Sequence, residues 1–364
     1  MEKKTVQSTT SHLEEGLSRR SFVKYGLGIG KAVFIGGLLV GNFAGCSTAS
    51  KKDKVTKAGR KTNIKFAHIT DTHVTFTGKN GTALVEESFD IFRDIVDQIK
   101  EMGDIDFILF GGDNINNTDP GTKGFDEFMN IMSSVEVPYF AQFGNREVSP
   151  IPHGIALSKQ QYATKMKGHG LDTGRYVWSV SPAPGLRILG LDTTIEGHNN
   201  GEIPHTELKW LKEEVAKYPH DMIITLSHHL FLPTWGSMDI PKWKKKYLLK
   251  NYQEINAILE GAPQVKACLM GHHHVSKIQT VDGLHYIASP ATVQYPHAFR
   301  TITIRDHEAR IQFHQVRNKR TVELGKRNLL TSKNAEEYAG GKAEDILAYC
   351  HGRELDNNVT LKLR

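Results

Sequence analysis

Short apolar segments that end in glycine and polar residues recur along the chain from residue 63 onward. The clearest is Phe107–Phe110, which predicts a strand buried on both faces and is followed directly by Gly111, Gly112 and Asp113. Glycines there let the backbone turn sharply and let other groups approach closely. Because ligands of open α/β sheets bind at the carboxyl ends of strands, Asp113 is a candidate functional residue.

The same pattern predicts further strands, which alternate with amphipathic helices. The expected strands are Ile64–Thr70, Val137–Phe143, Tyr176–Val180, Leu186–Leu191, Met222–Leu226 and Val265–Met270. Helices are expected over 85–99, 124–132 and 204–218. A basic stretch over 242–250 is expected to continue into a further helix up to Leu259, so that 242–259 forms one continuous segment. Residues 275–316 predict short antiparallel strands, and 335–350 a peripheral helix. This order is typical of an α/β fold with mostly parallel pairing and right-handed crossovers.

Composition narrows the class of protein. With 364 residues, 39% hydrophobic and 24% charged, the chain can form a packed globular body. A net charge of +6 is too small to indicate a nucleic-acid polymer as partner. Cys46, Cys268 and Cys350 form neither a disulfide framework nor a cysteine metal cluster.

The N-terminus has the features of an export signal. Ser18–Lys24 matches the pattern S-R-R-x-F-x-K and precedes a glycine-rich apolar run that is short for a membrane span, which resembles a twin-arginine signal. Phe43–Cys46 resembles a lipoprotein cleavage box, which implies a lipid on Cys46; an ordinary cleaved signal is the alternative. We therefore expect a signal over 1–45 and a flexible tether over 46–62. The protein would be periplasmic and anchored to the membrane by its lipid.

Oxygen and nitrogen donors gather at the predicted strand ends. They are Asp71, His73, Asp113, Asn145, His228 or His229, His272 and His274. On an extended backbone, residues two apart such as Asp71 and His73 point to the same face, which is suitable spacing for metal ligands. The lack of cysteine among these donors argues against a structural zinc cluster.

This set resembles the calcineurin-like metallophosphoesterases. The motifs are Asp71-x-His73, Gly112-Asp113, Gly144-Asn145, His228 and Gly271-His272-x-His274, within Ile64–Gln315. The resemblance implies a four-layer α/β/β/α sandwich of two mixed β-sheets flanked by helices, here over 63–317, with a C-terminal extension over 318–364. It also implies two divalent metal ions, one bound by Asp71, His73 and His274, the other by Asn145, His228 and His272, with Asp113 bridging both. A metal-bound hydroxide would then attack phosphorus. The ligand set suits Mn, Fe, Zn or Co without selecting one.

Four residues are expected at the reaction centre: Asp113, Asn145, Arg146 and His229. In this register His228 is the ligand and His229 lines the pocket, although Leu230 replaces the family's proline. Arg146 stands where most active phosphatases of the family have histidine. Arginine binds phosphate oxygens but cannot act as a general acid near neutral pH, so we expect it to favour diesters or pyrophosphates with good leaving groups.

Several functions remain open at this point. Residues 191–211 resemble the cyclic-nucleotide phosphodiesterase branch, which favours a phosphodiesterase acting on a small phosphoester. The alternatives are a pyrophosphatase or phosphatase acting on nucleotides or lipids, and a catalytically impaired binding protein on the same fold. Pocket walls are expected from 150–170 and 233–243. Side chains considered for supporting or pocket roles are His68, Thr72, Trp235, Trp243, Tyr295, His297 and Phe299, while His273 is expected to face outward.

Overall fold

The computed structural model describes residues 63–149, 156–171, 175–234, 241–333, 337–338 and 343–363. The expected signal and tether, Cys46 with its expected lipid, and Trp235 lie outside these residues.

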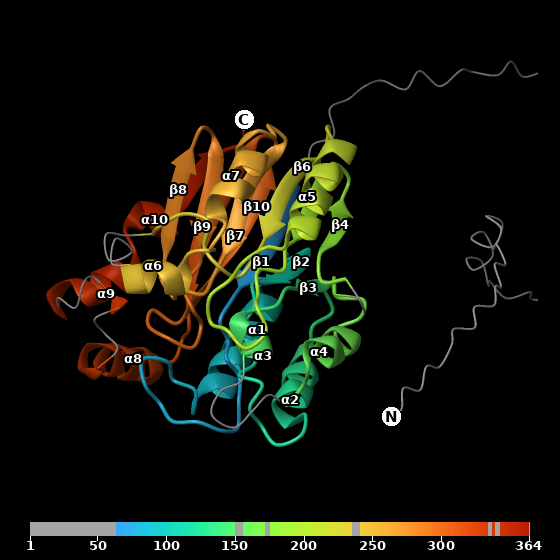
Figure 1. The fold of residues 1–364 in the computed structure, drawn as a ribbon. Coiled ribbons are helices and arrows are strands. Elements are labelled where there is room, and N and C mark those ends of the chain that lie inside the picture. Colours follow the sequence, from blue (N-terminus) through green and yellow to red (C-terminus); the bar gives the residue numbers. More distant parts are fainter. Residues whose placement is uncertain are drawn as a thin grey trace, which may run out of the picture. The chain divides into compact units, whose positions relative to one another are not determined.

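Two six-stranded mixed sheets form the centre of the fold (Figure 1). The first has the order β12-β11-β10-β1-β2-β3, with β1 parallel to β2 and antiparallel to β10. Its strands are β1 (Asn63–Ile69), β2 (Phe107–Phe110), β3 (Tyr139–Ala141), β10 (Ala298–Arg305), β11 (Glu308–Gln315) and β12 (Val359–Lys362). All four residues of β2 are buried, as expected for a strand covered on both faces.

The second sheet has the order β4-β5-β6-β7-β9-β8. Its strands are β4 (Trp178–Ala183), β5 (Leu186–Gly190), β6 (Met222–Leu226), β7 (Val265–Met270), β8 (Lys277–Val281) and β9 (Leu284–Ala288). The hairpin between β8 and β9 turns at Asp282 and Gly283, which both have positive φ.

Alternating side chains of the second sheet pack into two different cores. In β6, Ile224 and Leu226 belong to the core that also contains Phe66 of the first sheet. Ile223 instead packs in a second cluster with Leu208 of α5 (His205–Lys217) and residues of α7 (Tyr252–Glu260). On the other side, α1 (Ser88–Met102) and α2 (Lys123–Met132) pack their apolar stripes into the first core. The predicted layering of helix, sheet, sheet and helix is confirmed.

The predicted helix over 242–259 is wrong in one respect, because it is two helices. They are α6 (Pro241–Tyr247) and α7, and between them Leu248 pairs with Leu230 in a β-bridge. The Leu249 N–H then donates to the Leu230 carbonyl at 2.9 Å. These long-range bonds replace helical ones, which sequence periodicity cannot reveal.

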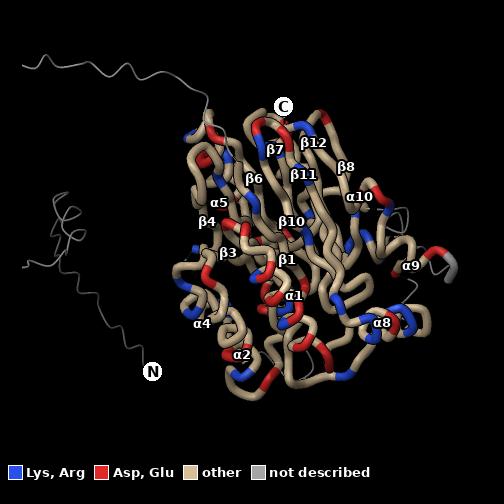
Figure 2. Tube along the Cα trace, turned by 180° about the vertical axis from the view of Figure 1, so that it is seen from behind, with Lys and Arg blue, Asp and Glu red and all other residues tan. Residues whose placement is uncertain are grey.

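The C-terminal part is more structured than its pattern indicates. It contains α8 (Lys319–Thr331), α9 (Ala343–His351) and α10 (Glu354–Asn357), and β12 pairs with β11 at the edge of the first sheet. Cys350 of α9 is fully buried. Two short helices, α3 (Asn145–Val148) and α4 (Lys159–Lys165), complete the fold near the site. Basic and acidic residues are interspersed along the trace (Figure 2).

Candidate metal centre and active-site cleft

The candidate ligands follow the strands as predicted, but the backbone there is not extended. Asp71, His73 and Asp113 have φ of 55°, 45° and 52°, and His272 and His274 have 66° and 60°. The expectation that residues two apart share a face on an extended strand is therefore wrong. Left-handed conformations of non-glycine residues are uncommon and cluster at functional sites. Backbone hydrogen bonds hold them here, such as His73 N–H to the Asp113 carbonyl at 2.8 Å.

Glycines in the motifs let these turns approach one another. Gly112 has φ of 89°, and a Cβ on it would lie 2.5 Å from the Gly144 nitrogen. A Cβ on Gly271 would lie 2.1 Å from Thr70 Oγ1 and 2.6 Å from Asp71 Oδ2. A side chain at either position would push the strand ends apart.

The turns bring six side chains into two groups that can each hold a metal ion. Each residue offers one ligand atom within 4.8 Å of the others in its group, and the groups are Asp71, His73, His274 and Asp113, His228, His272. Asp113 Oδ2 lies 3.4 Å from both His73 Nε2 and His228 Nε2, so it stands between the groups. Asn145 Oδ1 lies 3.2 Å from His228 Nε2. We call these seven residues the floor.

Each floor histidine has an oxygen partner on the ring nitrogen that faces away from its group. The pairs are His73 Nδ1 with Asn116 Oδ1 (2.9 Å), His228 Nδ1 with the Gly111 carbonyl (2.9 Å), His272 Nε2 with the Lys246 carbonyl (3.0 Å) and His274 Nδ1 with Gln294 Oε1 (3.1 Å). These oxygens accept, so each histidine donates there and directs its other lone pair into the group. Such outer partners are typical of metal-binding histidines.

The charges of the floor favour a bound cation. Burial raises the pKa of Asp113, but the His228 and His73 imidazoles outweigh it and lower the pKa to about 2. Burial lowers the pKa of His228, yet the Asp113 and Asp71 carboxylates raise it to about 9. The two carboxylates thus favour a positive charge at this position, and a bound metal ion would supply that charge in place of the proton on His228. The Nε2 atoms of His73 and His274 lie 3.3 Å apart, and Asp71 Oδ1 lies 3.1 Å from His274 Nε2. Converging lone pairs and carboxylates fit divalent metal ions of the Mn, Fe, Zn or Co type.

A buried carboxylate that the sequence reasoning did not single out fixes the two central turns. Glu147 accepts hydrogen bonds from the backbone N–H groups of Asp113 (3.0 Å), Asn114 (2.6 Å), Ile115 (3.1 Å) and Gly144 (2.7 Å). Burial and then the Asp113 charge raise the pKa of Glu147 to about 8. Its only sequence signal is its place two residues after Asn145.

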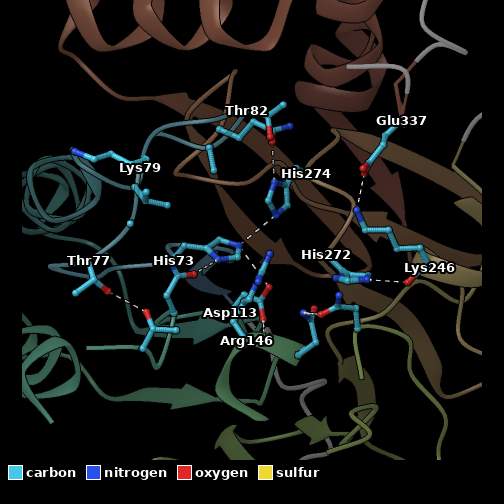
Figure 3. A pocket seen from close by; sticks show the side chains of 18 of the residues that line it. His73, Thr77, Lys79, Thr82, Asp113, Arg146, Lys246, His272, His274 and Glu337 are labelled. Atoms are coloured by element: carbon cyan, nitrogen blue, oxygen red, sulfur yellow. Dashed lines mark hydrogen bonds and ion pairs between the residues drawn. The ribbon is translucent and has the colours of Figure 1, made fainter. Parts of the chain in front are cut away.

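The floor opens into a cleft of about 740 Å³ (Figure 3). Arg146 lines it, and its backbone N–H donates to Asp113 Oδ1 at 2.7 Å. Side chains from distant parts of the chain form what we call the wall: Lys79, Lys246, Gln294, Glu337 and Tyr338. No sequence motif marked these wall residues. The described residues of the expected walls, 156–170, 233–234 and 241–243, do not line the cleft.

Several other expectations about the pocket are wrong. His229 is fully buried and does not line the cleft; Nδ1 pairs with Thr193 Oγ1 at 2.8 Å and Nε2 with the Asn199 carbonyl at 3.1 Å. Its ring packs on His272, 4.4 Å between centroids, so it supports that ligand from behind. His273 does not face outward: its buried ring lies 4.1 Å from that of Tyr247.

The remaining candidates are structural in the same way. Trp243, Tyr295, His297 and Phe299 are buried and are not among the residues that line the cleft. His68 pairs with Ser289 Oγ and Thr72 donates to the Asn114 carbonyl, so neither orients a floor histidine.

Comparison with known proteins agrees with this geometry. The sequence model of the calcineurin-like phosphoesterases matches residues 64–276. The chain belongs to this family. It is 27% identical over 242 residues to the 3',5'-cyclic adenosine monophosphate phosphodiesterase CpdA of Haemophilus influenzae, covering 66% of this chain and 81% of the relative. It is 28% identical over 232 residues to a cAMP/cGMP dual specificity phosphodiesterase of Mycobacterium tuberculosis, covering 62% and 66%.

A solved structure supports the fold. A dimetal phosphatase from Danio rerio superposes with a TM-score of 0.55 at 17% identity, covering 69% of this chain and 96% of that one. The protein is thus a metal-dependent phosphoester hydrolase, with two His/Asp groups suited to a binuclear metal centre.

Proposed function

We propose that the protein is a phosphodiesterase whose substrates are small diesters of the 3',5'-cyclic nucleotide kind. The observation that carries this proposal is Arg146. It lines the cleft beside Asp113, and within the described part of the chain no carboxylate forms an ion pair with its guanidinium. The substrate named for the CpdA relative, cAMP, is such a diester.

The floor residues divide the work in this proposal. Asp71, His73 and His274 would hold one metal ion, and His228 and His272, with Asn145 beside His228, would hold the other. Asp113, which lies between the two groups, would serve both. Two divalent ions bound there would supply Lewis acidity for the phosphoryl group and an activated water. The metal identity remains open among Mn, Fe, Zn and Co.

Arg146 orients the substrate and does not act as a proton donor. Its planar fork can bind two phosphoryl oxygens, but a guanidinium stays protonated near neutral pH and cannot donate a proton to a leaving group. His229 cannot replace it from the cleft, because its ring is buried and both ring nitrogens have partners. The 3'-alkoxide that leaves a cyclic nucleotide would therefore take its proton from water rather than from either of these residues.

The test compares three substrates on the full chain loaded with Mn²⁺. Bis-p-nitrophenyl phosphate and cAMP should be hydrolysed, p-nitrophenyl phosphate should react more slowly than the diester, and chelation by EDTA should abolish all turnover until Mn²⁺ is restored. Faster monoester turnover would instead indicate a phosphatase. No turnover at all would indicate a pyrophosphatase or a binding protein.

We also propose that the chain is exported by the twin-arginine route and anchored in the periplasm by a lipid on Cys46. The support is the Ser18–Lys24 and Phe43–Cys46 motifs. None of the described helices is long and apolar enough to cross a bilayer. Replacing Arg19 and Arg20 by Lys should keep the protein in the cytoplasm, whereas Cys46→Ser should release it from the membrane fraction. Unchanged fractionation of both variants would reject this proposal.

A further inference from the structure

The C-terminal part of the chain contributes a carboxylate to the cleft. Glu337 lies beyond the family match, which ends at residue 276, yet it lines the cleft with Lys246. Glu337 Oε2 lies 2.6 Å from Lys246 Nζ, and the Tyr247 hydroxyl donates to the same oxygen (Figure 3). The Glu337 side chain is only 11% exposed, so this ion pair is partly shielded from water.

The ion pair between Lys246 and Glu337 determines which cationic side chains of the cleft are free to bind a substrate. Three cationic side chains line the described part of the cleft: Lys79, Arg146 and Lys246. Lys79 pairs with Glu86 at 3.1 Å and points into solvent, with its side chain 91% exposed. Lys246 is held by Glu337. Arg146 alone among the three has no carboxylate partner in the described residues.

Lys246 lies close enough to the floor to bind a phosphoryl group there if its ion pair with Glu337 were broken. Its carbonyl accepts the His272 Nε2–H at 3.0 Å, so its side chain starts next to a floor residue. A lysine side chain is a flexible stem with a compact charge that can bind phosphate.

Both substrate classes would meet the same two metal ions, so the number of free cationic side chains is what can discriminate between them. A phosphodiester carries one negative charge, whereas a phosphomonoester has a second pKa near 6 and is largely dianionic at pH 7. One unpaired guanidinium matches the single charge of the diester. A dianion would gain more from a second cation, and the Glu337 carboxylate would repel it more.

We propose that Glu337 is a specificity-determining residue that holds Lys246 away from the phosphoryl group and so selects diesters over monoesters. The inference rests on the proposed phosphodiesterase function and adds the residue that sets its preference. The ion pair is formed by residues 91 positions apart, so this preference would depend on the C-terminal part rather than on the family motifs.

The test uses Glu337→Gln, which keeps a hydrogen-bonding side chain for Tyr247 and removes the charge. On the Mn²⁺-loaded full chain, kcat/KM for p-nitrophenyl phosphate relative to bis-p-nitrophenyl phosphate should rise on the order of tenfold, mainly through the monoester KM. Equilibrium binding of AMP, a dianionic monoester, should tighten by a similar factor, and the KM for cAMP should change less than twofold. Glu323→Gln, which removes a carboxylate paired to Lys326 on α8 outside the cleft lining, should change neither.

The double variant Glu337→Gln/Lys246→Met shows whether Lys246 causes the change in preference. If released Lys246 is responsible, the double variant should return to within about twofold of the wild-type preference. An unchanged AMP affinity in Glu337→Gln overturns the inference, and so does a gain that persists in the double variant. Because AMP binding is read without turnover, these outcomes are distinct from a wild-type enzyme that hydrolyses no diester, which would overturn the proposed function instead.

Discussion

The floor and the wall of the cleft are built in different ways. Floor side chains such as Asp71 and His228 are fully buried, follow strand ends directly and have fixed partners on their outer atoms. Wall side chains such as Lys79 and Lys246 are long and partly exposed, and Lys246 meets Glu337 across 91 positions of sequence. The floor can therefore fix the chemistry, while the wall can change with substrate. The difference predicts that floor substitutions abolish turnover and that wall substitutions redirect it.

The largest effect is expected at the centre of the floor. Asp113→Asn keeps the shape but removes the charge that lies between the two groups, so diester turnover should fall on the order of 10³-fold. The matched control is Asp282→Asn, because Asp282 also has positive φ (48°) but lies in the exposed β8–β9 hairpin. Steady-state kinetics with bis-p-nitrophenyl phosphate measures both. A loss of less than tenfold in Asp113→Asn would mean that the floor is not the reaction centre.

Arg146 lines the cleft beside the floor, and its replacement should change both the substrate preference and the rate. Arg146→His supplies an imidazole that can donate a proton, so monoester turnover should rise relative to diester turnover by about tenfold. Arg146→Met, which supplies neither charge nor proton, should lower diester kcat/KM by about 10- to 100-fold. Equal gains for monoester and diester in Arg146→His would refute the assigned role.

Gln294 tests whether a wall residue can act through the floor. Its Oε1 accepts the His274 Nδ1–H at 3.1 Å, so Gln294→Leu should weaken metal binding by about tenfold while Gln294→Glu retains most of it. Gln279→Leu on β8, which loses only a bond to the Pro233 carbonyl, is the matched control. Competition with a chelator reports the affinity directly. Equal metal affinities in the Leu and Glu variants would contradict an orienting role for this side chain.

The smallest effect concerns a half-buried carboxylate outside the floor, Glu207. Burial and then the Asp192 charge raise the pKa of Glu207 to about 7, whereas the floor histidines lower that of Asp113 despite burial. Since its folded-state pKa lies above its unfolded value of 4.5, the native state retains a proton that the unfolded state loses, and stability should decrease as pH rises from about 4.5 to 7.

Glu207→Gln removes this titration. Relative to the variant, the wild type should lose about 1 kcal/mol of unfolding free energy between pH 5 and pH 8, after allowance for partial exposure. Urea unfolding at the two pH values measures it. If the unfolding free energies of both proteins changed equally with pH, Glu207 would not be the cause of the lost stability.

The same contrast explains what the sequence could and could not predict. Motifs at strand ends identified six of the seven floor residues, because apolar strands followed closely by donors leave a local pattern, as in Phe107–Phe110 before Asp113. They left His228 and His229 open, and the family resemblance selected His228. The two-sheet layering followed from the family resemblance. The extended backbone assumed for Asp71 and His73 was wrong because tertiary hydrogen bonds hold these residues at positive φ.

Features that depend on distant contacts left no such pattern. His229 lies next to a ligand in sequence, yet packing against His272 and Thr193 removes it from the cleft. Glu337 and Gln294 line the cleft only because the fold brings them there from positions far from the motifs in sequence. Glu147 accepts hydrogen bonds from backbone N–H groups of two turns. Nothing in the sequence distinguishes it from other acidic residues that lie in turns.

The most direct test of the central claim is anomalous diffraction from crystals of the Mn²⁺-loaded protein. The account predicts two manganese peaks in the floor, one among Asp71, His73 and His274 and one among Asp113, His228 and His272, with Asp113 between them. A single peak, or peaks outside these groups, would contradict the binuclear centre on which the proposed reaction depends.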